Sequence, residues 1–172
     1  MKSLFYYSFF QIGLASCRQA TANKVLQKLR TKYFFPEDNV GYCSRSYTRD
    51  RGIVVVGSSP VGVDIEFCKS RKITLSNISS AKEIELAKLD LSSTHDFYKM
   101  WCAKEACMKI DQSSFKFLDY NLDIVAKENE WVFARDNNLL KTYNFVIKDY
   151  VYSFAVKYVY GDFSPKFRKG SI

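Results

Sequence analysis

The sequence has a single histidine, His95, and only 3 prolines and 7 glycines among 172 residues. One histidine excludes every mechanism that needs two imidazoles and leaves a Ser/His/Asp triad possible at one point only. The scarcity of proline and glycine excludes collagen-like, linker-like and disordered chains. No apolar run reaches the 18 residues of a membrane-spanning helix, so a membrane is not an expected partner.

The 5 cysteines are odd in number, and no two of them form a Cys-x-x-Cys pair. This pattern disfavours both a disulfide framework and a structural zinc site, and it favours a reducing, cytoplasmic location. The alternative is secretion, because residues 14–17 are similar to a lipoprotein processing box that follows an apolar run. Tyr6, Tyr7 and Gln11 interrupt that run, however, and favour an aromatic-rich strand.

Apolar and aromatic residues are abundant: 47% of the chain is hydrophobic, with 12 Tyr, 14 Phe and 2 Trp. A chain of this length and composition can form one domain, or two small lobes that share a core. Lys and Arg outnumber Asp and Glu by 26 to 18, which gives a net charge of +8. The excess favours an anionic partner: nucleic acid, a phosphorylated ligand, an acidic protein or anionic lipid.

The order of the expected elements predicts an α+β fold with antiparallel sheets. These elements are strands at 2–12, 42–47, 53–56, 61–67, 131–134, 141–147 and 150–160, and helices at 22–33, 79–91 and 94–110. A strand, a helix and further strands occur twice in this order, which predicts two lobes. We expect a shortened N-terminal lobe at 1–58, a C-terminal lobe at 59–165 and a frayed basic tail at 166–172.

The strand at 61–67 carries two acidic residues on one face. A period of two places Gly62, Asp64 and Glu66 together, opposite a face of apolar side chains only. Two carboxylates one pleat apart repel each other unless they are solvated or share a cation, and Mg²⁺ suits such oxygen ligands. The alternative is an ordinary solvated strand face.

The helix at 94–110, which Ser93 or Thr94 could cap, has a lysine in the middle of its apolar face. At about 100° per residue, Lys104 lies among apolar side chains, with Glu105 at the edge of that face and Lys109 just beyond it. A buried lysine is costly unless its ammonium meets an anion or its stem carries it to water. The alternative for Glu105 and Lys109 is a simple helix-stabilising pair.

The two segments resemble the two signatures of the 4′-phosphopantetheinyl transferases, Gly-x-Asp-x-Glu and Trp-x-x-Lys-Glu-Ala-x-x-Lys. They stand here as residues 62–66 and 101–109. The tryptophan in the second motif and the two-lobed layout look like the monomeric, surfactin-synthetase-activating (Sfp) type, in a compact form. The resemblance therefore implies a fold of two pseudo-symmetric α+β lobes and a monomeric protein.

The resemblance also implies an activity: transfer of the 4′-phosphopantetheine arm of coenzyme A to a serine of an apo acyl or peptidyl carrier protein, with release of adenosine 3′,5′-bisphosphate. Such carriers serve fatty-acid, polyketide or nonribosomal-peptide biosynthesis. Asp64, Glu66 and Glu105 are implied as the Mg²⁺ ligands, and Glu105 also as the base for the serine proton. Lys104 and Lys109 are implied as catalytic, coenzyme-A-binding groups that neutralise the phosphates.

One part of the family pattern is altered. Where the family has Ser-His-Ser, whose histidine helps to hold coenzyme A, this chain has Ser44-Arg45-Ser46, and the Gly-Lys/Arg-Pro element before it is missing. Because arginine can bind a phosphate through two hydrogen bonds, Arg45 and Ser46 are expected to bind coenzyme A. In the alternative, Arg45 lies on the surface and Arg49, Arg51 or a lysine of the first helix binds the phosphate.

Two other functions are compatible with parts of the sequence. The altered Ser-His-Ser element suits a protein that keeps the family fold but uses coenzyme A weakly or differently. The positive charge and aromatic strands suit a nucleic-acid-binding module, but that function would leave Asp64 and Glu66 without a role. Coenzyme A and a carrier protein, rather than nucleic acid, are therefore the expected partners.

Overall fold

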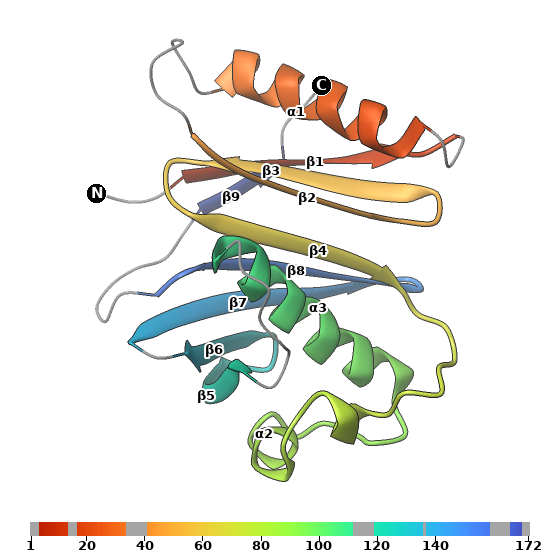
Figure 1. Cartoon of the computed structure of the whole chain (residues 1–172), viewed down its shortest axis with the longest axis vertical. Coiled ribbons are helices and arrows are strands. Elements are labelled where there is room, and N and C mark those ends of the chain that lie inside the picture. The colour runs from red at the N-terminus through yellow and green to blue at the C-terminus, as the bar shows by residue number, and fades with distance from the viewer. Residues whose placement is uncertain are drawn as a thin grey trace.

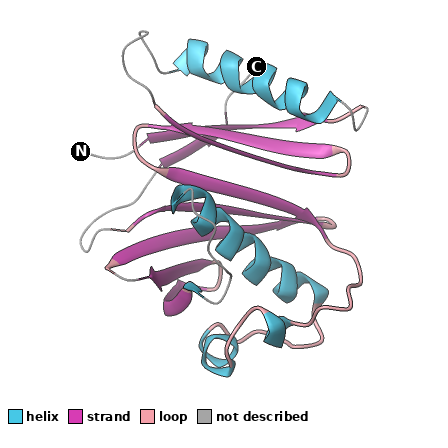
Figure 2. Ribbon diagram, viewed as in Figure 1, coloured by secondary structure: helices cyan, strands magenta, loops and turns pink. Residues whose placement is uncertain are grey.

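The computed structural model describes residues 4–13, 17–33, 41–111, 119–135, 137–158 and 166–169. Within them, two β-sheets and three α-helices confirm the expected mixed α+β class (Figures 1 and 2). The strands are β1 (Leu4–Gln11), β2 (Tyr42–Thr48), β3 (Arg51–Gly57), β4 (Val61–Phe67), β5 (Asn121–Lys127), β6 (Glu130–Arg135), β7 (Asn138–Ile147), β8 (Tyr150–Lys157) and β9 (Lys166–Lys169). The helices are α1 (Arg18–Tyr33), α2 (Ala81–Leu86), α3 (Thr94–Asp111) and the short 3₁₀ turn η2 (Leu75–Asn77). Parts of several expected features lie outside the described residues. They are residues 2–3 of the first expected strand, residues 14–16 of the lipoprotein-like box, residues 159–160 of the last expected strand and residues 170–172 of the tail.

The first sheet has the strand order β2-β3-β1-β9, and α1 covers one of its faces (Figure 1). The helix packs because Ala22, Val25 and Leu29 are buried at helical spacing against Val54 and Val56 of β3. The opposite side of α1 carries lysines and other polar residues. This sheet and its helix therefore form an N-terminal layer pair with its own small core.

The second sheet has the order β4-β8-β7-β6-β5, in which every neighbouring pair is antiparallel. Helix α3 lies across it and contacts β4, β8 and β7 (Figure 1). Met100 and Cys107 of α3 share a core with Trp131 and Phe133 of β6 and Val151 of β8. The long helix is thereby fixed against β4, the strand that carries the acidic pair.

A third core joins the two sheets. Phe5 and Ile53 of the first sheet are buried with Val63, Ile65 and Phe154 of the second. The apolar face of β4 therefore points to the first sheet, while its polar face points to α3. In both sheets the strand that precedes the helix pairs antiparallel with a later strand, β1 with β3 and β4 with β8.

The expectation of a frayed basic tail is wrong for residues 166–169, which form β9 beside β1. Phe167 explains the pairing, because its ring packs 5.2 Å from Phe5 and 4.8 Å from Phe154 between ring centroids. The pairing is parallel, so the first sheet is not purely antiparallel as expected. The packing of one aromatic side chain, flanked by charged residues, thus holds residues 166–169 in the sheet.

The helix expected at 79–91 is much shorter in the structure, where α2 spans only Ala81–Leu86. Ser80 and Glu83 form a capping box that starts α2, and Lys88, with a φ of 51°, adopts the left-handed conformation that ends it. The expected helix at 94–110 is confirmed as α3, and Ser93 is its cap, since the Ser93 hydroxyl accepts a hydrogen bond from the Asp96 amide at 3.2 Å. Within the part of the chain described, no helix combines the length and apolarity needed to cross a membrane.

Candidate active site

The predicted faces of β4 are confirmed, and Gly62 explains how close this strand lies to α3. A side chain at position 62 would overlap the backbone carbonyl of Ala106, so only glycine permits the approach. The next two residues on the same face, Asp64 and Glu66, therefore project toward α3. They meet Glu105 and Lys109, which α3 presents one turn apart on its strand-facing side.

Asp64 is buried, and its two carboxylate oxygens differ sharply. Oδ1 accepts hydrogen bonds from the Ser46 hydroxyl and the Lys109 ammonium, both at 2.7 Å. Oδ2 is also buried but has no hydrogen-bond partner. A buried carboxylate oxygen without a partner is costly, so this atom indicates a place for a cation.

Glu66 lies at the outer end of the same strand face. Its Oε2 atom receives a long hydrogen bond from Thr48, at 3.4 Å, and lies 3.6 Å from a guanidinium nitrogen of Arg71. Burial raises the pKa of Glu66, and the negative charge of Asp64 raises it further. Asp64 is therefore close enough to disfavour the charged form of Glu66.

Glu105 is the most perturbed carboxyl of the three. Burial raises its pKa to about 7, with a further contribution from Asp64, while Lys109 opposes the shift. Glu66 and Arg71 also act on it, in opposite directions. A carboxyl that titrates near neutral pH can accept a proton as a general base.

Asp64, Glu66 and Glu105 are oxygen donors that lie near one another in this region, and their chemistry is that of ligands for a divalent cation. Among the described residues, no three or more acidic, histidine or cysteine side chains are grouped closely enough to hold a metal ion as they stand. The negative charge of Asp64 nevertheless raises the pKa of both Glu66 and Glu105, and Asp64 offers a buried oxygen without a hydrogen-bond partner. A hard cation such as Mg²⁺ would relieve both, so the donor set suits it.

Lys109 lies within this cluster, as expected. Its ammonium bonds to Asp64 and donates to the Val63 carbonyl at 3.0 Å, and its side chain is 27% exposed. The ion pair thus crosses from α3 to β4, and Lys109 also favours the charged form of Glu105 on its own helix, so its role is not limited to a pair along the helix. Lys109 keeps enough exposure for its ammonium to reach a bound anion.

Lys104 is not part of the cluster. It is fully buried, and its ammonium bonds to Glu83 and to the Ile78 carbonyl, both at 2.9 Å. Burial lowers the pKa of Lys104, and Glu83 opposes that shift. The prediction that a buried lysine needs an anion is confirmed, but a phosphate-neutralising role does not fit an ammonium enclosed in this way.

Arg45 and Ser46 lie on opposite faces of β2. Ser46 faces β4 and bonds to Asp64, whereas Arg45 faces α1 and donates a hydrogen bond to Asn23. The structure therefore brings Ser46, but not Arg45, to the acidic residues. Alternation along a strand accounts for the separation of these two neighbours.

Arg71 is a site residue that motif reading did not single out. Its guanidinium lies over the rings of Tyr98 and Trp101, at 4.8 and 5.1 Å from their centroids, and its Nε donates to the Tyr98 hydroxyl at 2.5 Å. Together with Lys69 it also lines a hollow of about 190 Å³. Its only signal in the sequence is the basic stretch with Lys69, Arg71 and Lys72 that follows the strand at 61–67.

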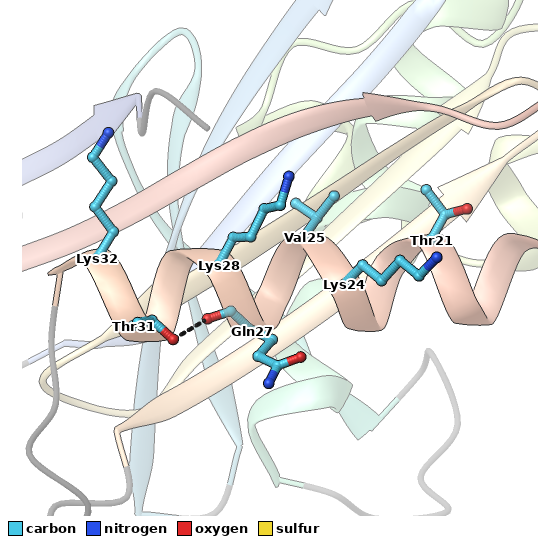
Figure 3. A pocket seen from close by; sticks show the side chains of 7 residues that line it. All are labelled: Thr21, Lys24, Val25, Gln27, Lys28, Thr31 and Lys32. Atoms are coloured by element: carbon cyan, nitrogen blue, oxygen red, sulfur yellow. Dashed lines mark hydrogen bonds between the residues drawn. The ribbon is translucent and has the colours of Figure 1, made fainter.

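A larger hollow lies elsewhere, along α1. The hollow has a volume of about 660 Å³. Figure 3 shows the residues that line it, which are Lys24, Lys28 and Lys32 with Thr21, Val25, Gln27 and Thr31. None of these residues belongs to the acidic cluster. Basic side chains therefore lie along the outer helix as well as beside β4, where Arg71 and Lys109 are found.

Fold and site together define an α+β protein that gathers three carboxylates and a lysine between a glycine-bearing strand and a long helix. A family model described as the 4′-phosphopantetheinyl transferase superfamily matches residues 60–155, more than half of the chain. The chain belongs to this superfamily. No curated protein shows significant similarity to it.

Proposed function

We propose that the protein transfers the 4′-phosphopantetheine arm of coenzyme A to a serine of an apo acyl or peptidyl carrier protein. The observation that carries the proposal is the meeting of Asp64, Glu66, Glu105 and Lys109 between β4 and α3, inside the segment that matches the superfamily. In this proposal Asp64, Glu66 and Glu105 bind Mg²⁺. The bound ion would supply positive charge to the pyrophosphate of coenzyme A.

Glu105 is the group that we propose to take the proton of the carrier serine. Its raised pKa, about 7, suits a base at neutral pH. The serine oxygen forms a bond to the phosphorus that bears the pantetheine arm, and the bond from that phosphorus to the bridging oxygen breaks. Adenosine 3′,5′-bisphosphate leaves with the electron pair of that bond.

Lys109 and Arg71 are the cations that we propose for the phosphates. Lys109 is partly exposed beside Asp64, and Arg71 lies beside Glu66 at a surface hollow. Positive charge held at the place where negative charge develops lowers the barrier of phosphoryl transfer. Lys104 has no part in this step, because its ammonium is enclosed with Glu83.

The two-sheet layout and the tryptophan of the second motif support the Sfp type, a monomeric enzyme in the cytoplasm. In this proposal the lobes at 1–58 and 59–165 form one site, with residues of β2 beside those of β4. A second candidate is a family member with altered use of coenzyme A. The position of Arg45 favours it, because the residue that replaces the family histidine faces α1 rather than the acidic cluster.

The test is to incubate the protein with coenzyme A, Mg²⁺ and a panel of apo carrier proteins, and to read the intact mass of each carrier. One phosphopantetheine group should be added to at least one carrier. Asp64→Asn and Glu105→Gln should abolish the addition while the far-ultraviolet circular dichroism stays unchanged, because both residues contact the reacting groups rather than the core. Transfer at the wild-type rate in either variant would contradict the proposal. Calorimetry with coenzyme A separates the second candidate, which predicts Mg²⁺ binding with weak or no coenzyme A binding.

A further inference from the structure

Three hydroxyl side chains alternate along β2 and all reach β4, the strand of the acidic residues. The Ser44 hydroxyl accepts a hydrogen bond from the Val63 amide at 3.1 Å, and the hydroxyls of Ser46 and Thr48 donate to Asp64 and Glu66. We call Ser44, Ser46 and Thr48 the hydroxyl row. A period of two places all three on one face of β2, so one strand of the first sheet runs along the acidic strand of the second.

The member of the row that bonds to Asp64 selects one of its oxygens. Ser46 and Lys109 both bond to Oδ1, while the buried Oδ2 is left without a partner. Two bonds on one oxygen fix the rotation of the carboxylate. The other oxygen is thereby held in a fixed, buried position.

Glu66 likewise has its two polar contacts on one carboxylate oxygen, but both contacts are longer than those of Asp64. The Thr48 hydroxyl and the Arg71 guanidinium both approach Oε2. The Thr48 contact is at the long limit of a hydrogen bond, and Glu66 is less buried than Asp64. The row therefore restrains both acidic residues of β4, and Asp64 more firmly than Glu66.

We propose that Ser46 and Thr48 are positioning residues, which turn the carboxylates of β4 so that Oδ2 of Asp64 and the second oxygen of Glu66 face a divalent cation. This inference rests on the cation site of the proposed function. It also gives Ser46 a different role from coenzyme A binding, since its hydroxyl proton is used on Asp64. The cation site is then incomplete without the first sheet, although its acidic ligands lie in β4 of the second sheet and in α3.

Groups that orient a metal ligand affect affinity without touching the metal, and their loss typically costs about 10- to 100-fold in metal affinity or activity. Ser44 provides a matched control in the same row. It is as buried as Ser46, at 9% exposure for each, but it bonds to the backbone rather than to a carboxylate. A purely structural role of the row would give Ser44 and Ser46 the same effect.

The experiment titrates the metal-free full-length protein with Mn²⁺, a hard cation that gives an electron paramagnetic resonance signal when free. The Kd for Mn²⁺ is compared among the wild type, Ser46→Ala, Thr48→Val and Ser44→Ala. We expect Ser46→Ala to raise the Kd by about 10- to 100-fold. Thr48→Val should raise it by only about 2- to 5-fold, because its bond is longer.

The control Ser44→Ala should lower the Tm, since it leaves the Val63 amide unpaired, yet change the Kd by less than about twofold. Ser46→Thr, which keeps a hydroxyl, should restore affinity to within about threefold of the wild type. Ser46→Cys serves in place of Ser46→Ala if the alanine variant does not fold, because it keeps the size and loses the strong donor.

An unchanged Kd in Ser46→Ala, or equal losses in Ser46→Ala and Ser44→Ala, would overturn the inference. So would a wild type that binds no Mn²⁺. Failure of the proposed function is a separate result, because it is read from the mass of the carrier protein. A wild type that binds Mn²⁺ and modifies no carrier would refute the transfer, while the Mn²⁺ affinities of the variants would still decide the role of the row.

Discussion

Replacement of Lys104 by methionine should destabilise the protein without removing its chemistry. Lys104 is fully buried, and its ammonium bonds to Glu83 and to the Ile78 carbonyl. Lys104→Met keeps most of the side-chain volume but leaves the carboxylate of Glu83 buried without its counter-ion. The same residue is expected, from its motif alone, to act on phosphate, so the two roles make opposite predictions.

The magnitude follows from the partners of Glu83. Removal of one member of a buried ion pair costs about 3 to 5 kcal/mol in the free energy of unfolding. The value should lie at the lower end of that range, because Glu83 keeps bonds from the amides of Ser80 and Leu122, at 2.8 and 2.9 Å. For a chain of this size each kcal/mol lowers the Tm by roughly 2 to 4 °C, so a loss of about 3 kcal/mol should lower the Tm by roughly 6 to 12 °C.

Urea unfolding followed by circular dichroism measures the loss, and carrier modification is assayed at a temperature where both proteins are folded. The rate per folded molecule should stay within about threefold of the wild type, because Lys104 touches no reacting group. The double variant Lys104→Met/Glu83→Gln should recover part of the stability, since it leaves no unpaired charge. A rate that falls by about 10²- to 10³-fold at unchanged stability would instead place Lys104 on the phosphates and refute the reasoning.

Other changes test the contacts around the cluster. Gly62→Ala should cost about 1 to 3 kcal/mol in urea unfolding, because a methyl group would overlap the Ala106 carbonyl, whereas Gly13→Ala, with open space around it, should cost far less. Because the pKa of Glu105 is raised to about 7 in the fold, its contribution to stability without metal is complete below pH 4 to 5 and is lost as the pH rises through 7. Thermal unfolding in a chelator should therefore show a decline between pH 5 and 8 that is absent in Glu105→Gln. If Arg45 binds coenzyme A, Arg45→Ala should weaken coenzyme A binding in calorimetry by about 10- to 150-fold, and unchanged affinity would assign the phosphate to other basic residues.

The parts of the site that depend on one element could be predicted from the sequence. Alternation gave the polar face of β4 with Asp64 and Glu66, and helical spacing put Lys104 within the apolar face of α3. Both are periodic patterns that a single strand or helix must obey. The requirement of Lys104 for an anion followed from the cost of burying an ammonium, and the structure meets it.

The identity of that anion could not be predicted, because it depends on how distant segments pack. Glu83 lies in a short helix, 21 residues before Lys104. Glu85 and Asp90 are acidic residues at similar distances from Lys104 in the sequence. The capping box of Ser80 and Glu83 can be recognised in the sequence, and it explains where α2 begins. It does not explain why the other carboxylate oxygen of Glu83, Oε1, faces Lys104. Likewise β9 depends on one phenylalanine in a basic segment, and its partner strand is at the other end of the chain.

The hydroxyl row extends the candidate site beyond the residues that match the superfamily. All three carboxylates and Lys109 lie within the matched residues 60–155, yet the bonds that restrain Asp64 and Glu66 from the other side come from Ser46 and Thr48 in β2. The apolar face of β4 likewise needs the first sheet, since Val63 and Ile65 are buried against Phe5 and Ile53. One strand therefore serves both the core and the acidic cluster, and both of its faces depend on the N-terminal sheet. A sequence motif records the acidic residues themselves, whereas their orientation is a property of the interface between the two sheets.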